Sequence, residues 1–420
     1  MSPDQPPDQR GSLALTSRRG FLTGAAPLAV GGPALAQAGR SRAGAAAGSL
    51  LAYAGTYSSS GPEGTRANGP GILTFEKNPS TGVLSQRDVL PFALNPSWLA
   101  FNPARTHLYS ANETLTFEGA NSGSVSAFSI QRSTGRLTLL NTVSSQGAGP
   151  AHVSVHPSGR YLLAANYNGG TIAVFPIQPD GALGAAVDVH HDQGRLGPNH
   201  ASSAPPGAFA KGHESPHAHM IQADPSGRFV FSNDLALDRI LVWEFDVETG
   251  KLSANDPAGV DLPPGDGPRH FAFHPNRRWF YSLQEEGSTL ALFDYDAGRG
   301  QLTARRTVST LPKGFAGTSF TSEVVVSPGG RFLYAANRLH DSIALFSIGE
   351  DGALAYAGEE WTRGSYPRSF TIDPTGDFLY VCNQRSDAIV TFRADRKTGK
   401  LAFTGQYTPV GSPSILVFLT

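Results

Sequence analysis

The sequence predicts an all-β fold, a seven-bladed β-propeller closed by both ends of the chain. Three observations support this prediction. A unit of about 50 residues recurs along the chain, the composition suits short strands and turns, and a seventh copy of the unit is split between the two ends. Residues 51–420 are therefore expected to form one domain.

The repeated unit is an apolar strand, a turn containing proline, a second apolar strand that ends in a polar residue, and a third strand that ends in an aromatic residue. The turn prolines are 54, 68, 50, 53 and 46 residues apart; they are Pro103, Pro157, Pro225, Pro275, Pro328 and Pro374. One such sheet cannot bury both faces alone, so it needs neighbours on each side. In one copy we expect strands at 269–273, 279–283 and 289–293, with a fourth after Gly300.

The composition agrees with this fold and excludes several classes of function. The 420 residues include 48 glycines, 31 prolines and 16% charged residues, as is typical of short strands joined by many turns. The 33 basic and 34 acidic residues form no long like-charge run, which argues against a nucleic-acid or membrane-surface protein. The single cysteine, Cys382, excludes an internal disulfide, and its place in an apolar run indicates a core residue.

The seventh copy of the unit is assembled from the two ends. Residues 412–418 match the beginning of the other copies, and residues 51–57 and 71–75 match a second and a third strand. Pairing of 51–57 beside 412–419 would close the ring and remove the open sheet edge that invites aggregation.

The N-terminus resembles a targeting segment. Residues 17–23 read Ser-Arg-Arg-Gly-Phe-Leu-Thr, and small residues near Ala36 and Ala38 suit signal cleavage. Residues 1–40 are therefore assigned to a twin-arginine-type export signal and leader, with the twin-arginine translocase as partner during export and a periplasmic or secreted destination. A disordered leader with a chance arginine pair is the alternative. No other stretch approaches the roughly 18 apolar residues of a membrane span.

Two sets of positions near the strand ends are polar, and they differ in kind. Nine residues after each turn proline a polar residue recurs in every copy, which indicates that it satisfies backbone groups where the second strand ends. These residues are Asn112, Asn166, Asp234, Gln284, Asn337 and Asn383. Other positions at the same rim break the repeat while keeping ionisable side chains, and these are better candidates for function.

The repeat-breaking residues should gather at one mouth of the central channel, because the first strand begins and the second ends at the same rim. They are Arg269, Arg338, Arg368, His152, His219, Glu285 and Glu323. Three inward guanidinium groups indicate a carboxylate or phosphate ligand. A ring of salt bridges between blades is the structural alternative.

At these residues the sequence resembles the propeller lactonase family, which includes bacterial 6-phosphogluconolactonase and the fungal carboxy-muconate lactonizing enzyme. The resemblance covers about residues 50–420. It rests on the order and spacing of short motifs: Pro216-His-Ala-His-Met, Gly267-Pro-Arg-His, Ala336-Asn-Arg, Pro367-Arg-Ser-Phe and the Gly-x-Leu turns that end the blades.

The resemblance implies a set of site residues. The catalytic His, Arg, Glu and Arg of the fungal branch fall on His219, Arg269, Glu285 and Arg338. Substrate-binding residues are then expected at His152, Arg368, Glu323, His270 and His217. No cofactor or metal is expected.

Two features depart from the family pattern. The usual Asn-Glu-Leu after the second strand reads Gln284-Glu285-Glu286, which adds a carboxylate beside the central acid. The segment 188–214 is long and carries His190, His191, His200 and His213. It lacks the ordered spacing of a metal site, so a flexible lid or surface loop is the preferred interpretation and a metal site the alternative.

The predicted function is hydrolysis of a sugar-derived lactone, phosphorylated or not, such as 6-phosphogluconolactone. Glu285 or His219 would act as general base or acid, and Arg269 and Arg338 would stabilise negative charge. No GxSxG motif is present, which argues against a covalent acyl-enzyme. A muconate-type lactone cyclase or isomerase and an exported, non-catalytic ligand-binding propeller are the alternatives.

Overall fold

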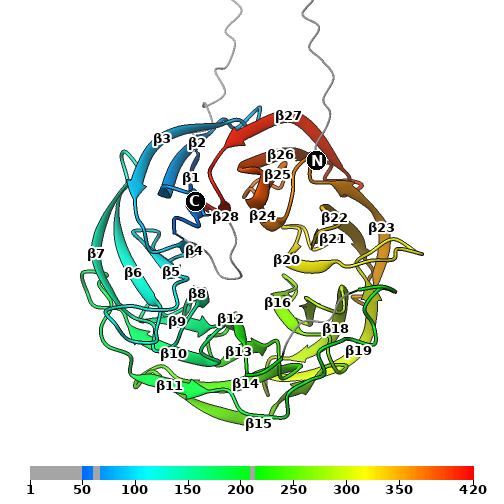
Figure 1. The fold of residues 1–420 in the computed structure, drawn as a ribbon, viewed down its shortest axis with the longest axis horizontal. Helices are drawn as coiled ribbons and strands as arrows, with labels where there is room; N and C mark the ends of the chain where they lie inside the picture. Colours follow the sequence, from blue (N-terminus) through cyan, green and yellow to red (C-terminus); the bar gives the residue numbers. More distant parts are fainter. Residues whose placement is uncertain (1–49, 60–66, 209–212) are drawn as a thin grey trace, which may run out of the picture. The chain divides into compact units, whose positions relative to one another are not determined.

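The structure is a computed structural model and describes residues 50–59, 67–208 and 213–420. The predicted export signal, residues 1–40, lies outside these described residues. Within them, 28 strands form seven antiparallel four-stranded sheets, arranged as blades around a common centre (Figure 1). The described part contains no α-helix, only one 3₁₀ turn at Gln384–Ser386. The prediction of a seven-bladed β-propeller is confirmed.

Each blade begins with its innermost strand and ends with its outermost one. From the centre outward, blade 1 has β28 (Pro413–Leu419), β1 (Leu50–Thr56), β2 (Gly71–Lys77) and β3 (Leu84–Pro91). Blade 2 has β4 (Pro96–Phe101), β5 (His107–Asn112), β6 (Ser124–Gln131) and β7 (Arg136–Ser144). Blade 3 has β8 (Pro150–Val155), β9 (Tyr161–Asn166), β10 (Thr171–Pro176) and the short β11 (Asp188–His191).

The remaining four blades repeat this order. Blade 4 has β12 (Ala218–Ala223), β13 (Phe229–Asp234), β14 (Arg239–Asp246) and β15 (Lys251–Asp261). Blade 5 has β16 (Pro268–Phe273), β17 (Trp279–Gln284), β18 (Thr289–Asp296) and β19 (Gln301–Ser309). Blade 6 has β20 (Phe320–Val326), β21 (Phe332–Arg338), β22 (Ser342–Ile348) and β23 (Leu354–Trp361). Blade 7 has β24 (Pro367–Ile372), β25 (Phe378–Asn383), β26 (Ala388–Ala394) and β27 (Leu401–Pro409).

The ring is closed within blade 1, where segments from opposite ends of the sequence share one sheet. Strand β28 pairs with β1, with Leu51 opposite Leu419 and Ala54 opposite Leu416. This is the predicted pairing of 51–57 beside 412–419. The inner edge of β1 is thereby covered by hydrogen bonds and is not exposed to solvent.

The apolar core consists of layers between adjacent blades, because each sheet presents hydrophobic side chains on both faces. Seven clusters of buried side chains occur in the described residues, one at each interface between neighbouring blades. Cys382 is fully buried in the cluster between blades 7 and 1, and burial raises the pKa of its thiol to about 12. It is a core residue, as predicted.

The Gly-x-Leu turns that end the blades hold neighbouring blades together. A buried tyrosine in the second strand of one blade donates its hydroxyl to the glycine carbonyl of the next blade. Tyr281, for example, bonds Gly352 at 3.0 Å, and Tyr334 bonds Gly399 at 2.7 Å. These two glycines have φ of 84° and 74°, a conformation that favours glycine. A Cβ atom on Gly352 would also lie 2.5 Å from the ring of Trp279.

The polar residue that ends the second strand has the predicted structural role in several blades. Asn337 donates to the carbonyl of Thr310 at 3.0 Å, and Asn383 donates to the carbonyl of Thr362 at 3.0 Å. Asp234 accepts a hydrogen bond from the backbone N–H of Leu237 at 2.9 Å. These side chains are fully buried, so they satisfy turn backbone groups that water cannot reach.

Candidate active site at the centre of the ring

Every innermost strand carries a β-bulge close to its first residue, and this bulge positions the side chains of the site. In β16, Pro268 pairs with Gln284 and His270 pairs with Leu283, so Arg269 is the extra residue. The same irregularity occurs in all seven blades. A bulge re-aims a side chain and is over-represented next to active sites. The bulged residues include Ser97, Ala151, His219, Arg269, Arg368, Ser414 and, in β20, the pair Ser322 and Glu323.

Glu285 lies between two buried guanidinium groups. Its Oε2 is 2.8 Å from Nε of Arg269 and 2.7 Å from Nη2 of Arg338. All three residues are at most 3% exposed. Arg269 belongs to the same blade as Glu285, whereas Arg338 comes from blade 6, so the carboxylate also links two blades.

Each of these arginines has further partners that fix its position. Arg269 donates through Nη1 to the carbonyl of Ser322. Arg338 donates to the carbonyl of Thr321 at 2.8 Å and to the hydroxyl of Tyr366 at 3.2 Å. Burial, reinforced by the neighbouring arginines, lowers the pKa of Arg269 to about 10. Burial opposes the charge on Arg338, yet Glu285 raises its pKa above the ordinary value. Both guanidinium groups are therefore charged at neutral pH.

A second ion pair joins blades 7 and 2 across blade 1. Nη2 of Arg368 lies 3.5 Å from Oε1 of Glu113, and the hydroxyl of Tyr57 donates to Oε2 of Glu113 at 2.7 Å. The Arg368 guanidinium also lies over the Tyr57 ring, 5.6 Å from its centroid. The Arg368 side chain is 16% exposed, so it is the most accessible of the three central arginines.

Aromatic rings from four blades meet on the other side of the site. His270 is 5.0 Å from Trp98, 5.7 Å from His152 and 5.1 Å from His219, measured between ring centroids. Tyr167 lies 5.5 Å from His219. Since Trp98 and His270 come from blades 2 and 5, these rings close the centre of the propeller at this level.

The three central histidines are neutral at physiological pH. Burial holds the pKa of His152, His219 and His270 well below the ordinary value, and the positive charge of Arg269 adds to this effect. His270 also contacts a buried acid, with Nδ1 at 3.1 Å from Oε1 of Glu323. Burial raises the pKa of Glu323 to about 8.

The structure brings eight of the nine predicted site residues into one group. Arg269, Glu285 and Arg338 are in contact, His270 links Arg269 to Glu323, and the remaining members pack around them; these are His152, His219 and Arg368. His217 is at the edge of the group. It stacks on Tyr167 with ring centroids 4.4 Å apart, and its Nδ1 donates a hydrogen bond to the Tyr167 carbonyl at 2.9 Å.

Several residues of the group were not predicted. Glu113 occupies the same place in its blade as Glu285, directly after the second strand, so the repeat carried a signal for it. Trp98 likewise occupies the place of His152 and His270 in the first strand. Tyr57 directly follows the second strand of blade 1, which is the place of Glu113 in blade 2. Tyr366 directly precedes the first strand of blade 7, where blade 5 carries Gly267. The repeat therefore carried a signal for both tyrosines as well.

Glu286, the additional acid after Glu285, does not join the central group. Its Oε1 lies 3.1 Å from Nε2 of His213. Burial opposes protonation of His213, yet Glu286 raises its pKa above the ordinary value. The extra carboxylate therefore holds the long segment 188–214 against blade 5 and does not sit beside the Glu285 carboxylate.

The histidines of this segment are dispersed. His190 contacts Asp188 at 2.9 Å and the ring of Trp243, whereas His200 contacts backbone carbonyls. Among the described residues, no group of three or more His, Cys, Asp or Glu side chains has the geometry to hold a metal ion.

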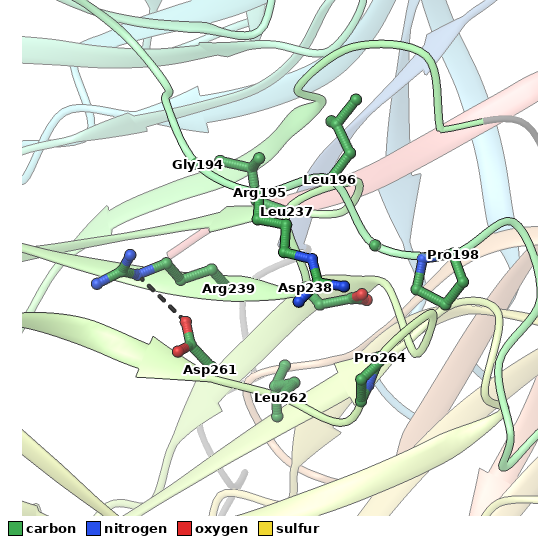
Figure 2. Close-up of a pocket in the computed structure, with 11 residues that line it drawn as sticks. Gly194, Arg195, Leu196, Pro198, Leu237, Asp238, Arg239, Asp261, Leu262 and Pro264 are labelled. Atoms are coloured by element: carbon green, nitrogen blue, oxygen red, sulfur yellow. Dashed lines mark ion pairs between the residues drawn. The ribbon is translucent and has the colours of Figure 1, made fainter.

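A pocket of about 520 Å³ lies beneath this segment, over the outer strands β14 and β15 of blade 4 (Figure 2). Its walls include Leu237, Leu262 and Arg195, and also Arg239 and Asp261, which pair at 3.5 Å between the neighbouring strands β14 and β15. None of the residues predicted for the site lines this pocket. Because the buried arginines, acids and neutral imidazoles are at the centre of the ring, we place the candidate active site there.

Comparison with known proteins shows the family of the chain. The sequence model described as "Lactonase, 7-bladed beta-propeller" matches residues 51–418. The chain belongs to this lactonase family. As a family member it is a lactonase, a carboxylic ester hydrolase.

Relatives resemble the chain over most of its length. A 6-phosphogluconolactonase of Bacillus subtilis is 32% identical over 88% of this chain and 98% of the relative. Another protein of that name, from Formosa agariphila, is 30% identical over 83% of this chain and 96% of the relative. The structure of the periplasmic gluconolactonase of Pseudomonas aeruginosa is similar with a TM-score of 0.78 and 30% identity, covering 89% of this chain and 99% of that one.

None of the helices in the part of the chain that the structure describes is long and apolar enough to cross a bilayer.

Proposed function

We propose that the protein hydrolyses a sugar-derived aldonolactone at the centre of the ring, by general acid–base catalysis without a covalent intermediate. The observation that carries the proposal is the pairing of neutral, buried imidazoles with buried guanidinium groups in one site. The lactonase relatives support the reaction class.

His219 is the general base in this proposal. Its imidazole is neutral at physiological pH because burial lowers its pKa, and a neutral imidazole can accept a proton from water. Its Nδ1 is buried and has no hydrogen-bond partner among the described residues. A water molecule bonded to this nitrogen would satisfy it and would be the attacking nucleophile.

The arginines stabilise the negative charge that forms on the lactone carbonyl. In this proposal the guanidinium of Arg269, which can only donate hydrogen bonds, bonds the oxyanion. Guanidinium groups in a buried site stabilise such charge far more than they would in water. Glu285 is the counter-ion of Arg269 and Arg338 in this arrangement, because both guanidinium groups bond its Oε2.

The charge balance favours an unphosphorylated lactone. Three guanidinium groups face two carboxylates with which they pair, Glu113 and Glu285, which leaves about one positive charge for the oxyanion. A phosphate dianion would add a larger opposing charge than these residues leave unpaired. The periplasmic gluconolactonase of Pseudomonas aeruginosa supports the same choice.

The test is a hydrolysis screen of aldonolactones, with each 6-phosphate compared with its unphosphorylated parent and the spontaneous rate subtracted. We expect catalysed ring opening, with a higher kcat/KM for the unphosphorylated parent. A higher kcat/KM for the phosphate would overturn the charge argument. Binding of aldonolactones without turnover would replace the hydrolase by a ligand-binding propeller.

We also propose that the protein is exported as a folded domain through the twin-arginine pathway. Arg18 and Arg19 support this, and residues 50–420 need no disulfide that the oxidising compartment would have to supply. Replacing both arginines by lysine should leave the lactonase activity in the cytoplasm. Periplasmic activity equal to that of the wild type would contradict this route.

A further inference from the structure

Glu323 differs from the other two acids of the central site. Glu113 and Glu285 each lie within ion-pair distance of an arginine, whereas no guanidinium of the described residues lies within that distance of Glu323. Its Oε1 is 3.1 Å from Nδ1 of His270 and accepts the backbone N–H of Val324 at 3.0 Å. The Glu323 side chain is 10% exposed.

The contacts of His270 define which of its nitrogens carries the proton. Nη1 of Arg269 lies 3.3 Å from Nε2 of His270, and a guanidinium group can only donate. Nε2 is therefore the acceptor, and the single proton of the neutral imidazole is on Nδ1. That proton is donated to Oε1 of Glu323, which also accepts the Val324 amide. Oε2 is the oxygen left to carry the proton of the acid itself.

The surroundings of Glu323 favour its protonated form at neutral pH. Burial raises its pKa to about 8, and Arg269 only partly offsets this because Glu285 neutralises that guanidinium. The neighbouring groups are neutral: His270 on β16 has a depressed pKa, and the Cys382 thiol on β25 has a pKa of about 12. A carboxylic acid kept neutral in this way can donate a proton near pH 7.

We propose that Glu323 is the general acid of the hydrolysis and that His270 is its positioning residue. This inference rests on the proposed lactonase function and assigns the second proton transfer of that reaction. His270 lies between the two proton-transfer groups, since its ring contacts His219 on one side and Glu323 on the other.

The proposed reaction contains two proton transfers. Water adds to the lactone carbonyl carbon while Nδ1 of His219 takes its proton, and the carbonyl oxygen becomes an oxyanion beside Arg269. The bond between the acyl carbon and the ring oxygen then breaks, and the ring oxygen leaves with the Oε2 proton of Glu323. The products are a hydroxy acid, protonated His219 and the Glu323 carboxylate. The hydroxy acid loses its proton at neutral pH, and proton exchange with water restores His219 and Glu323.

The decisive experiment compares an oxygen lactone with the thiolactone of the same ring. A thiolate can leave without a proton, whereas an alkoxide must be protonated as it leaves. The general acid therefore matters for the oxygen lactone and not for the thiolactone. Turnover of both is followed from about pH 5 to about pH 10 in wild type, Glu323→Gln, His270→Gln and the control Glu286→Gln. The full chain is used, with unfolding midpoints measured for each variant.

Wild-type kcat for the lactone should fall above about pH 8, where Glu323 loses its proton, and kcat for the thiolactone should show no such fall. Glu323→Gln should lower lactone turnover about 10²–10⁴-fold, remove the alkaline fall and leave thiolactone turnover within about threefold. His270→Gln should move the alkaline fall to a different pH. Glu286→Gln should match the wild type.

Equal losses on lactone and thiolactone in Glu323→Gln would show a structural residue and overturn the assignment. Wild-type turnover of the lactone by that variant would overturn it also, while leaving the proposed function intact. A folded wild type that opens neither substrate would overturn both. If Glu323→Gln does not fold, the pH profiles of wild-type kcat for the two substrates test the assignment. An alkaline fall in kcat for both lactone and thiolactone would contradict Glu323 as the general acid.

Discussion

The two halves of the central site use equivalent positions of the repeat but differ in charge: one half holds neutral rings, and the other holds paired ions. One half, which we call the ring half, consists of Trp98, His152, Tyr167, His219 and His270. The other, the charged half, consists of Arg269, Arg338, Arg368, Glu113 and Glu285. In the ring half burial keeps the imidazoles neutral, whereas in the charged half each guanidinium keeps its charge because a carboxylate faces it.

The difference shows that the same β-bulge can present either a neutral proton acceptor or a charged guanidinium group to the site. The bulge of β12 presents His219, and that of β16 presents Arg269. Placing an unpaired charge in either half would cost several kcal/mol. The ring half avoids this cost by staying neutral and so retains a proton acceptor. The charged half avoids it by pairing and so retains cations for a developing oxyanion.

The largest expected effect on stability and turnover comes from removing the Glu285 carboxylate, which two arginines of the charged half share. Glu285→Gln leaves the buried Arg269 and Arg338 without their common counter-ion, which should lower the free energy of unfolding by about 3–5 kcal/mol. Turnover of the best lactone should fall about 100-fold or more, because Arg269 no longer has a fixed position. Urea unfolding and steady-state kinetics measure the two effects.

Glu286→Gln is the matched control, since its carboxylate pairs with His213 outside the central site. It should retain wild-type turnover. Wild-type stability and turnover in Glu285→Gln would show that the charged half does not depend on a carboxylate counter-ion, and would contradict the contrast between the two halves.

The ring half should make stability depend on pH in the acid range. Below about pH 6.5 the unfolded imidazoles bind protons, while the folded ones, with depressed pKa, do not. Each of the three histidines should therefore contribute a loss of unfolding free energy as pH falls, of up to about 1.4 kcal/mol per pH unit. The raised pKa of Glu323 contributes with the opposite sign, so the contribution of a histidine is read from the difference between wild type and a histidine variant. Urea unfolding at several pH values measures this slope.

His152→Gln should reduce that slope by the contribution of one histidine. An unchanged slope in the variant would contradict a neutral imidazole at His152.

Arg368 offers a smaller test at the accessible edge of the charged half. Its pairing with Glu113 at 3.5 Å is looser than the contacts of Arg269 and Arg338, and its side chain is 16% exposed. Arg368→Gln should raise KM about tenfold, a loss of about 1.4 kcal/mol, with kcat within about threefold. A fall in kcat with unchanged KM would place Arg368 in the chemical step instead.

The smallest effect is expected at a position that obeys the repeat. Asn383→Ala removes a buried hydrogen bond to the Thr362 carbonyl and should cost about 1–3 kcal/mol of unfolding free energy. Kinetic constants should stay at wild-type values, because Asn383 contacts neither half of the site. A loss of turnover in a stably folded Asn383→Ala protein would show that repeat-obeying positions also carry function.

The fold could be predicted from the sequence because its determinants are local and periodic. Proline turns at regular spacing and Gly-x-Leu turns mark each blade, and the match of 412–418 to the other strand beginnings predicts the pairing seen between β28 and β1. The general position of the site followed from the same periodicity, since the residues that break the repeat are at or beside the bulges of the innermost strands.

The pairing within the site could not be predicted, because it depends on side-chain conformations across different blades. The spacing of the repeat predicts that Arg269, Glu285 and Arg338 lie at one rim. It does not predict that both guanidinium groups contact the same carboxylate oxygen. The sequence likewise leaves both Glu285 and His219 as candidates for the base, because the contact of Glu285 with two guanidinium groups depends on the same side-chain conformations. Tyr57 gained its role only because blade 1 brings it beside Glu113.

A lactone should bind between the two halves of the site, and a crystal structure with the lactam analogue of the best lactone substrate would show whether it does. A lactam keeps the ring and carbonyl of the substrate and resists ring opening. We expect the lactam carbonyl oxygen within hydrogen-bond distance of Arg269 and the lactam ring against His219. A lactam bound in the pocket over β14 and β15, or at the centre of the ring with its carbonyl turned away from every arginine, would contradict it.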